Sequence, residues 1–290
     1  MPERLLIGIE EASLTFGGKP IFENIDLFIN EGDKICLVGK NGSGKTTLMR
    51  MINGELELDA GTRFLYPGTT IGYLAQKVDF NAASTVYEFV LEGLKKDEHF
   101  EEKKHLADII IGPLGIDPKA LMGHLSGGQL RRAALARSLV EAPDVLMLDE
   151  PTNHMDLEAI KWLETYLAGY KGALIVVSHD RTFLRNISRK VFWIDRGIIR
   201  TSPGGYDDFE EWADKILEQE ARALQNMNKK LEREIDWTQG GVTGRRKRNI
   251  RRMNELHRLR DKIAKDMERQ LRGNAGVSFN YIVQALHEVR

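Results

Sequence analysis

The chain has 290 residues, of which 42% are hydrophobic and 29% are charged, a composition typical of a globular protein that buries a core. It contains no run of about 18 apolar residues, and its N-terminal segment lacks the basic, apolar and small-residue regions of a secretion signal. These features argue against an integral membrane protein and a secreted one, so we expect a cytoplasmic protein. The single cysteine, Cys36, cannot form an internal disulfide and lies in an apolar run, which predicts a buried thiol.

The charge of the chain is unevenly distributed. The formal net charge is only −1, yet residues 241–272 contain 12 Lys and Arg against 4 Asp and Glu, a net charge of +8 for this segment. It belongs to a long polar stretch without β-type runs that begins near residue 206 and is broken by glycines at 239–244. The pattern predicts two helices joined by a turn, packed as an antiparallel hairpin whose second arm is basic.

Three short apolar runs in the first two thirds of the chain predict parallel β-strands. They cover residues 35–38, 145–148 and 173–177, and polar residues follow each of them directly. In open α/β sheets ligands bind at the carboxyl ends of the strands, so the three polar clusters should meet at one edge. Three further runs near the N-terminus predict a separate antiparallel patch, at residues 6–9, 12–16 and 25–29.

The first polar cluster matches the phosphate-loop pattern G-x-x-x-x-G-K-[ST] in full, and a helix-compatible segment follows it. Backbone N–H groups of such a loop surround phosphate oxygens, and the helix N-terminus adds positive potential. We expect Lys45 to meet the β- and γ-phosphates and Thr46 to bind Mg²⁺ through its hydroxyl. The other predicted nucleotide-binding residues of this segment are Gly39, Asn41, Gly42, Ser43, Gly44 and Thr47.

The second cluster places two carboxylates, Asp149 and Glu150, just beyond a predicted buried strand. Burying such a pair is costly unless a cation or a proton transfer requires it. We therefore predict that Asp149 lies on the Mg²⁺ side and that Glu150 polarises the attacking water. His179, just after the third strand, would sense the γ-phosphate and hold the water in place. A purely structural acidic pair is the alternative, and the phosphate loop argues against it.

A third motif narrows the class of nucleotide-binding protein. Leu125-Ser126-Gly127-Gly128-Gln129 precedes a helical segment with several arginines and lies ahead of the predicted strand that ends in the two carboxylates. Ser-Gly-Gly alone is common in loops, but the ordered series resembles the ABC superfamily. The resemblance implies that Ser126, Gly127 and Gly128 contact the γ-phosphate bound by an opposite nucleotide domain. It also implies that Gln129 belongs to the nucleotide-binding residues.

The resemblance implies three further residues of the nucleotide site. Gln76 stands where the family has its Q-loop glutamine, on the metal side, and Asp156 stands where it has the D-loop aspartate. Phe16 precedes the phosphate loop and would stack on adenine, with a core phenylalanine as the competing interpretation. For Gln76 the competing interpretation is a solvated loop residue. The implied cofactors are ATP and Mg²⁺, and the implied activity is ATP hydrolysis.

Within the superfamily, residues 149–156, Asp-Glu-Pro-Thr-Asn-His-Met-Asp, resemble the ABC-F subfamily, which has no membrane domain and has leucine where this chain has Met155. Residues 237–240 (Trp-Thr-Gln-Gly) and 245–249 (Arg-Arg-Lys-Arg-Asn) resemble the inter-domain linker of Uup-type members. In ABC-F proteins this linker reaches toward the peptidyl-transferase region and P-site tRNA. The resemblance therefore implies the ribosome as partner.

The cations at the expected hairpin tip favour contacts with nucleic-acid phosphates independently of the resemblance. A solvated charged helix is the alternative. No RNA-reading fold or aromatic stacking set is evident in the arm, so we do not expect base-sequence specificity. Ribosomal RNA or tRNA is the first expected partner, and branched DNA, to which Uup-like members have been linked, is a second. The predicted contact residues are Arg245, Arg246, Lys247, Arg248, Arg251 and Arg252.

Together these features predict an α/β fold: a P-loop ABC nucleotide-binding domain with a mostly parallel core sheet, an antiparallel β patch and a helical subdomain, followed by an antiparallel α-helical hairpin. We expect the domain at 1–205, the basic linker at 206–272 and a short tail of unassigned role at 273–290.

ABC-F proteins of this type carry two nucleotide domains, whereas this sequence shows one. A truncated, a split and a true half-size protein are all compatible with that difference. A homodimer or a separate chain would have to complete each ATP site, and a lone domain should hydrolyse ATP weakly. The ATPase subunit of a membrane transporter is a further alternative, since it shares the motifs up to His179.

Overall fold

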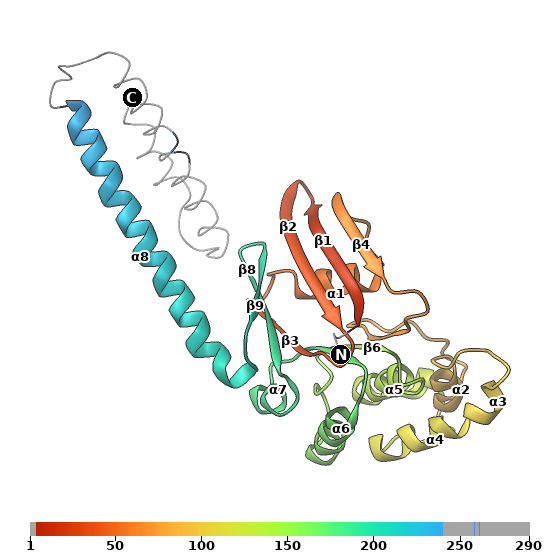
Figure 1. Ribbon diagram of the computed structural model, residues 1–290. Coiled ribbons are helices and arrows are strands. Elements are labelled where there is room, and N and C mark those ends of the chain that lie inside the picture. Colours follow the sequence, from red (N-terminus) through yellow and green to blue (C-terminus); the bar gives the residue numbers. More distant parts are fainter. Residues whose placement is uncertain (1–3, 240–257, 259–260, 262–290) are drawn as a thin grey trace. The chain divides into compact units, whose positions relative to one another are not determined.

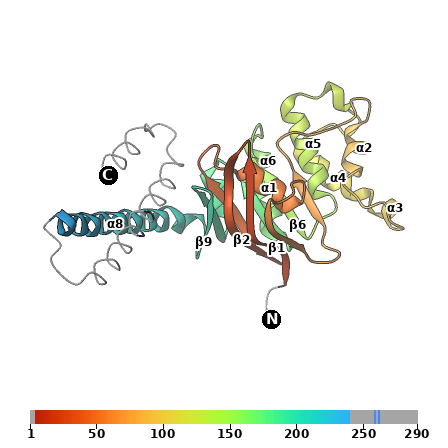
Figure 2. The same cartoon turned by 90° about the horizontal axis from the view of Figure 1, so that it is seen from above.

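The computed structural model describes residues 4–239 together with residues 258 and 261. These divide into two units, one ending at Phe209 and the other beginning at Glu210. The first unit contains a six-stranded sheet in the order β5-β6-β7-β3-β8-β9 and a three-stranded sheet in the order β2-β1-β4 (Figures 1 and 2). The predicted α/β class is confirmed.

The six-stranded sheet contains the three strands expected from the apolar runs. β3 (Lys34–Gly39), β6 (Val145–Asp149) and β7 (Ala173–Val177) are parallel neighbours. Every residue of β6 and β7 is buried, because a central parallel strand is covered on both faces. β5 (Ile71–Leu74) and β8 (Lys190–Asp195) extend the sheet in parallel, and β9 (Ile198–Ser202) pairs antiparallel with β8.

The three-stranded sheet is the expected antiparallel patch, with one correction. β1 (Leu5–Phe16) pairs with β2 (Lys19–Asn30) and with β4 (Ala60–Leu65). The prediction of two strands at 6–9 and 12–16 was wrong, because β1 runs on through an irregularity in its pairing. There Glu11 has a φ of 49° and its N–H donates to Oδ1 of Asp26 at 2.8 Å, so the backbone stays bonded where the polar residues interrupt the apolar pattern.

One hydrophobic cluster joins the two sheets through α1 (Lys45–Asn53). Four apolar side chains of this short helix are fully buried, and they contact residues of both sheets. Cys36 of β3 is also fully buried, as expected, and burial raises the pKa of its thiol to about 11. The core therefore fixes the start of α1 against the end of β3. The buried residues of α1 are Leu48, Met49, Met51 and Ile52.

A group of helices gathers beside the sheets, as Figure 2 shows for α2 to α5. It contains α2 (Val86–Leu91), α3 (Phe100–Lys103), α4 (His105–Ile111), the 3₁₀ turns η1 (Gly112–Leu114) and η2 (Met122–His124), and α5 (Gly127–Leu139). After α2 the chain comes so close to α5 that a Cβ at Gly93 would lie 2.1 Å from the carbonyl oxygen of Arg137. This group is the expected helical subdomain. α6 (Leu157–Gly169) follows β6 and α7 (Arg181–Ile187) follows β7.

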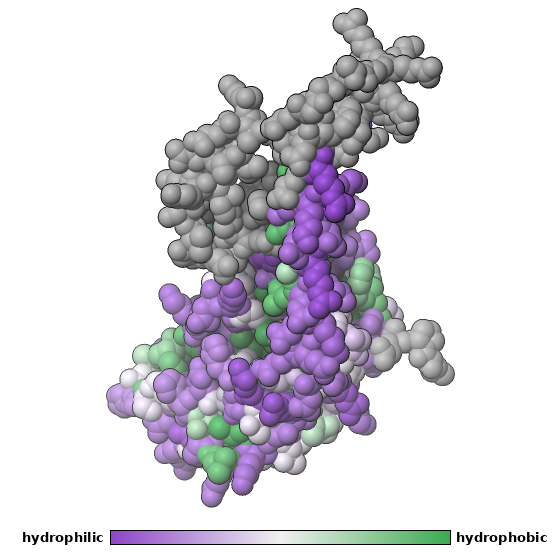
Figure 3. All heavy atoms as spheres, turned by 90° about the vertical axis from the view of Figure 1, so that its left-hand side faces the viewer, coloured by the Kyte–Doolittle hydropathy of each residue, from purple (hydrophilic) through white to green (hydrophobic). Residues whose placement is uncertain are grey.

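The helix α8 (Tyr206–Gln239) covers the residues predicted to form the first arm of the hairpin. At its start Phe209 packs edge-on against Trp193 of β8, with ring centroids 5.9 Å apart. Further along, apolar residues recur at three- and four-residue spacing, while the other positions are charged or polar, and Figure 3 shows the helix as a largely hydrophilic column. The turn and the second arm of the expected hairpin lie outside the described residues.

Candidate nucleotide site

The phosphate loop connects β3 to α1 and depends on glycine at two positions. Gly42 and Gly44 have φ values of 77° and 101°, in the left-handed region that glycine tolerates. At Gly44 an added Cβ would also lie 2.9 Å from the side chains of Ile21 and Phe22 on β2. The loop is therefore pressed against the antiparallel sheet. Of the other predicted loop residues, Asn41 is exposed and Thr47 is half-buried on α1.

Lys45, the first residue of α1, turns its side chain back into the loop. Its Nζ donates to the carbonyl oxygens of Gly39 at 2.8 Å and Lys40 at 3.2 Å. Burial lowers the pKa of Lys45, and the carboxylates of Glu150 and Asp149 oppose that shift. The ammonium group thus lies where the loop would surround an anion. The hydroxyl of Ser43 is buried in the same loop with no hydrogen-bond partner, and phosphate oxygens would supply one.

Asp149 and Thr46, which were both predicted on the metal side, are hydrogen-bonded to each other. Thr46 Oγ1 donates to Asp149 Oδ2 at 3.1 Å, and Asp149 is only 3% exposed. Burial raises the pKa of Asp149, while the Thr46 hydrogen bond and the cations of Arg131 and Lys45 lower it. The described residues contain no group of three or more His, Cys, Asp or Glu that could hold a metal alone. A hydroxyl and one carboxylate suit Mg²⁺, which binds through few protein oxygens together with substrate phosphates and water.

Glu150 and His179 are brought together at the ends of β6 and β7. Glu150 has a φ of 53°, and its N–H donates to the Val177 carbonyl at 2.8 Å. The His179 N–H donates to Glu150 Oε2 at 3.2 Å, and His179 Nε2 lies 3.4 Å from Oε1. Burial raises the pKa of Glu150, while His179 acts in the opposite direction. The Glu150 side chain is 13% exposed and the His179 side chain 71%, so a largely buried carboxylate lies beside an exposed imidazole.

The signature residues are arranged around the start of α5. Ser126 caps this helix: its hydroxyl accepts from the Gln129 N–H at 3.3 Å, and its own N–H donates to Gln129 Oε1 at 2.9 Å. Gly127 is exposed and Gly128 packs so closely on His154 that an added Cβ would lie 3.2 Å from its Cβ. The signature therefore presents a capped helix N-terminus to its surroundings.

Asp156 caps the helix that follows, and it is linked to α5. Its Oδ1 accepts from the Ala159 N–H at 2.8 Å, and its Oδ2 lies 3.8 Å from Nη1 of Arg132. Because Gly128 also packs on His154, the signature lies next to the segment around Asp156. Leu157 beside it is 66% exposed.

Two predicted nucleotide residues have no side-chain contact that tests their role. Gln76 is exposed in the loop after β5. Phe16 is 67% exposed at the turn from β1 to β2, where a buried core position was the competing interpretation. Its exposure leaves the ring free to stack on a base, and the adenine role stays a prediction.

Sequence reasoning missed Arg131, which connects several parts of this site. Its guanidinium donates to the backbone carbonyls of Ala75 and Asp149 and, at 3.4 Å, to that of Gln76. No signal in the sequence separates it from the arginines at 132 and 137 on the same helix, because the carbonyls it reaches come from distant segments. The predicted nucleic-acid residues, from Arg245 to Arg252, lie outside the described residues.

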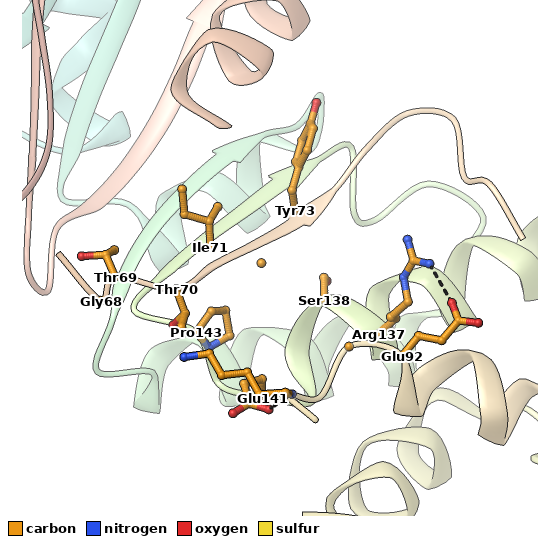
Figure 4. A pocket seen from close by; sticks show the side chains of 13 residues that line it. Gly68, Thr69, Thr70, Ile71, Tyr73, Glu92, Arg137, Ser138, Glu141 and Pro143 are labelled. Atoms are coloured by element: carbon orange, nitrogen blue, oxygen red, sulfur yellow. Dashed lines mark hydrogen bonds and ion pairs between the residues drawn. The ribbon is translucent and has the colours of Figure 1, made fainter. Parts of the chain in front are cut away.

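A pocket of about 660 Å³ lies apart from the phosphate loop (Figure 4). It is lined by β5 and its preceding turn, by the segment after α2 and by the end of α5. Arg137 pairs with Glu92 across one side of it at 3.4 Å, while Tyr73 is directed away from this ion pair. None of the predicted nucleotide residues lines it.

Comparison with known proteins agrees with this geometry. The sequence profile described as ABC transporter matches residues 22–153. The ATP-binding protein Uup of Buchnera aphidicola subsp. Acyrthosiphon pisum is 40% identical over 269 residues, covering 91% of this chain and 45% of that protein. The chain belongs to the ABC-F ATP-binding proteins.

Another ABC-F relative and a solved structure extend the comparison. The energy-dependent translational throttle protein EttA of Escherichia coli K12 is 33% identical over 277 residues, covering 82% of this chain and 50% of EttA. The chain thus spans about half the length of these curated relatives. A dimeric bacterial ABC transporter cassette, 21% identical, matches 68% of this chain and 98% of its own with a TM-score of 0.59, which shows the same fold. Among the described residues no helix is long and apolar enough to cross a bilayer.

Proposed function

We propose that this ABC-F chain binds ATP with Mg²⁺, hydrolyses it together with a second nucleotide domain, and uses the cycle on the ribosome. The observation that carries the ATPase is the convergence of the Thr46–Asp149 and Glu150–His179 pairs beside the phosphate loop. The ribosomal part is supported by the basic segment 241–272 and by the relative named as a translational throttle protein.

Phosphate binding follows from the loop and the start of α1. Its backbone N–H groups, the Lys45 ammonium and the Ser43 hydroxyl would hold the phosphate oxygens, and the helix N-terminus adds positive potential. Thr46 and Asp149 would hold Mg²⁺, which when bound neutralises charge that develops on the phosphates. Phe16 would stack on adenine, and Gln76 would approach from the metal side.

Hydrolysis follows from the second pair. Glu150 would accept the proton of a water as its oxygen bonds to the γ-phosphorus, while the bond to the β–γ bridging oxygen breaks to leave ADP and phosphate. His179, hydrogen-bonded through its backbone to Glu150, would contact the γ-phosphate with its open ring. Because the pKa of Glu150 is raised, its carboxylate binds a proton more strongly, and it can act as the base only at pH values above that pKa.

In this proposal a second nucleotide domain completes each ATP site, and the signature is what this chain contributes to the site of the other domain. Ser126 caps an exposed helix N-terminus and is bonded to its own helix. Such a terminus binds anions, and in this proposal the anion is the γ-phosphate of the opposite domain. The segment around Asp156, which lies next to the signature, would also contact the second nucleotide domain. The solved cassette with this fold is a dimer, which supports the arrangement.

The ribosomal part is tested by trapping the ATP-bound state. The full chain with Glu150→Gln, incubated with ATP and Mg²⁺, should cosediment with ribosomes more than the wild type does, because blocked hydrolysis preserves the closed form. Lys45→Ala is the matched control, since it should lose nucleotide binding and stay in the supernatant. If Glu150→Gln is not enriched with ribosomes at chain concentrations at which the wild type hydrolyses ATP, the ribosomal role is contradicted.

Competition identifies the partner if ribosomes are not preferred. Ribosomes, tRNA and four-way DNA junctions should be compared at one stated salt concentration, because phosphate contacts weaken steeply with salt. Stronger competition by the junction would favour the branched-DNA alternative, which rests on the same basic segment. Copurification with an integral membrane protein would favour the transporter alternative.

A further inference from the structure

Arg131 lies on the second turn of α5, the helix that Ser126 caps, and its side chain reaches the nucleotide site of its own domain. The guanidinium donates to the carbonyls of Ala75 and Asp149 and, at 3.4 Å, to that of Gln76. The first and third carbonyls belong to the loop after β5, and the second ends β6. One side chain therefore bonds two segments that meet only in the folded domain.

The chemistry of this position calls for arginine. A planar guanidinium offers five N–H donors in a fixed fork, whereas a lysine ammonium is a single point charge. Burial lowers the pKa of Arg131, and the carboxylates of Asp149 and Glu150 oppose that shift. Because arginine stays protonated in proteins, the segment that bears both carboxylates has a permanent cation beside it.

We infer that Arg131 is a positioning residue for the Mg²⁺ side of the nucleotide site. By holding the carbonyl of Asp149 it orients the carboxylate that pairs with Thr46, and by holding Ala75 it fixes the loop that carries Gln76. Outer-shell groups of this kind orient metal ligands without touching the metal. Since Ser126 caps the same helix, Arg131 also ties the signature of this domain to its own metal side. The inference rests on the proposed nucleotide function.

Arg137 provides a matched control on the same helix. Its guanidinium pairs with Glu92 at 3.4 Å and lies over the Phe89 ring, 4.4 Å from the ring centre. These contacts lie within the helical subdomain and involve none of the carbonyls that Arg131 holds. Arg137→Met therefore removes an α5 arginine and its packing while leaving the nucleotide side intact.

The test measures binding of ADP that carries a methylanthraniloyl fluorophore on its ribose, with Mg²⁺ and with EDTA. Arg131→Met should bind about tenfold more weakly than the wild type with Mg²⁺, the size of effect that outer-shell substitutions produce, and within about twofold of it in EDTA. Arg131→Lys should be weakened in the same Mg²⁺-dependent way, because it keeps the charge but loses the fork. Arg137→Met should match the wild type in both conditions.

Equal weakening with and without Mg²⁺ would overturn the inference, because it would mark general damage to the loop. So would an Arg131→Met variant with the full Mg²⁺ dependence of the wild type. Should Arg131→Met fail to fold, as judged by thermal unfolding, Arg131→Lys decides by the same comparison. A wild-type chain that binds no ADP in either condition would contradict the proposed nucleotide function and this inference with it, whereas a defect confined to the variants concerns Arg131 alone.

Discussion

The hydroxyl of Thr46 donates a 3.1 Å hydrogen bond to Oδ2 of Asp149, joining the start of α1 to the end of β6. Asp149 is 3% exposed, so this hydroxyl is one of the few groups that compensate a buried carboxylate. The Thr46 hydroxyl and the Asp149 carboxylate are also the groups proposed to bind Mg²⁺. The bond therefore links the stability of the site to its metal chemistry.

Replacing Thr46 by valine keeps the shape of the side chain and removes the hydroxyl. We expect the free energy of unfolding to fall by about 1–3 kcal/mol, the loss typical when a charged acceptor loses its donor. Mg²⁺ should then no longer increase nucleotide affinity, as measured by titration with the fluorescent ADP. Thr46→Ser, which keeps the hydroxyl, should retain that increase, and equal behaviour of the two variants would contradict the assignment.

The buried carboxylate also predicts a pH dependence in EDTA. Burial raises the pKa of Asp149, so the folded chain binds this proton more tightly than the unfolded chain does. The resulting stabilisation is complete below the unfolded pKa and is lost as the pH rises through the folded pKa. Asp149→Asn should therefore be more stable than the wild type at neutral pH, and the difference should disappear in acid. Denaturant unfolding of both proteins from acid to neutral pH measures this stability difference. A variant less stable than the wild type at neutral pH would contradict the prediction.

Much of the fold could be predicted because hydrophobic pattern and chemistry coincide in this chain. The runs that form β3, β6 and β7 are short, apolar and followed by polar residues. The sequence alone therefore predicted both the strands and the polar clusters at their ends. β4 could not be identified in this way: it contains glycine and arginine, and only its pairing with β1 defines it. The prediction of separate strands at 6–9 and 12–16 was wrong because the Glu11 N–H is hydrogen-bonded to Asp26, so β1 continues through its polar residues.

Candidate site residues could be predicted where one segment supplies several groups, as in the phosphate loop and the pair Asp149–Glu150. They could not be predicted where segments distant in sequence come together in the fold. Arg131 resembles its neighbouring arginines until the folded chain brings the carbonyls of Ala75 and Asp149 to it. The pocket beside β5 was also unpredicted, since β5 and α5 form it together.

Glu150 is expected to control hydrolysis without controlling binding. Glu150→Gln keeps the size of the side chain and removes the proton acceptor, so the rate should fall by roughly 10²–10⁴-fold while ATP affinity changes little. Because burial raises the pKa of Glu150, the wild-type rate should decline as acid protonates it. Phosphate release measured against pH tests both statements, and a variant with the wild-type rate would exclude Glu150 as the base.

The signature can be disabled without breaking its helix. Ser126→Asp preserves an N-cap but places a negative charge where the opposite γ-phosphate should lie. Nucleotide binding and thermal stability should be unchanged, and hydrolysis should be lost. If the chain pairs with itself, an equal mixture with Glu150→Gln should recover roughly a quarter of the wild-type rate, since half the dimers carry one intact site. A mixture no more active than its components would contradict self-pairing.

In our proposal this chain carries the cis half of an ATP site and depends on a second nucleotide domain for hydrolysis. The most direct measurement is ATPase turnover per chain over roughly a thousandfold dilution series. We expect weak turnover in dilute solution that rises with concentration. A turnover that stays constant across the series, at the full rate of a two-domain relative measured alongside, would show that hydrolysis does not depend on a second nucleotide domain.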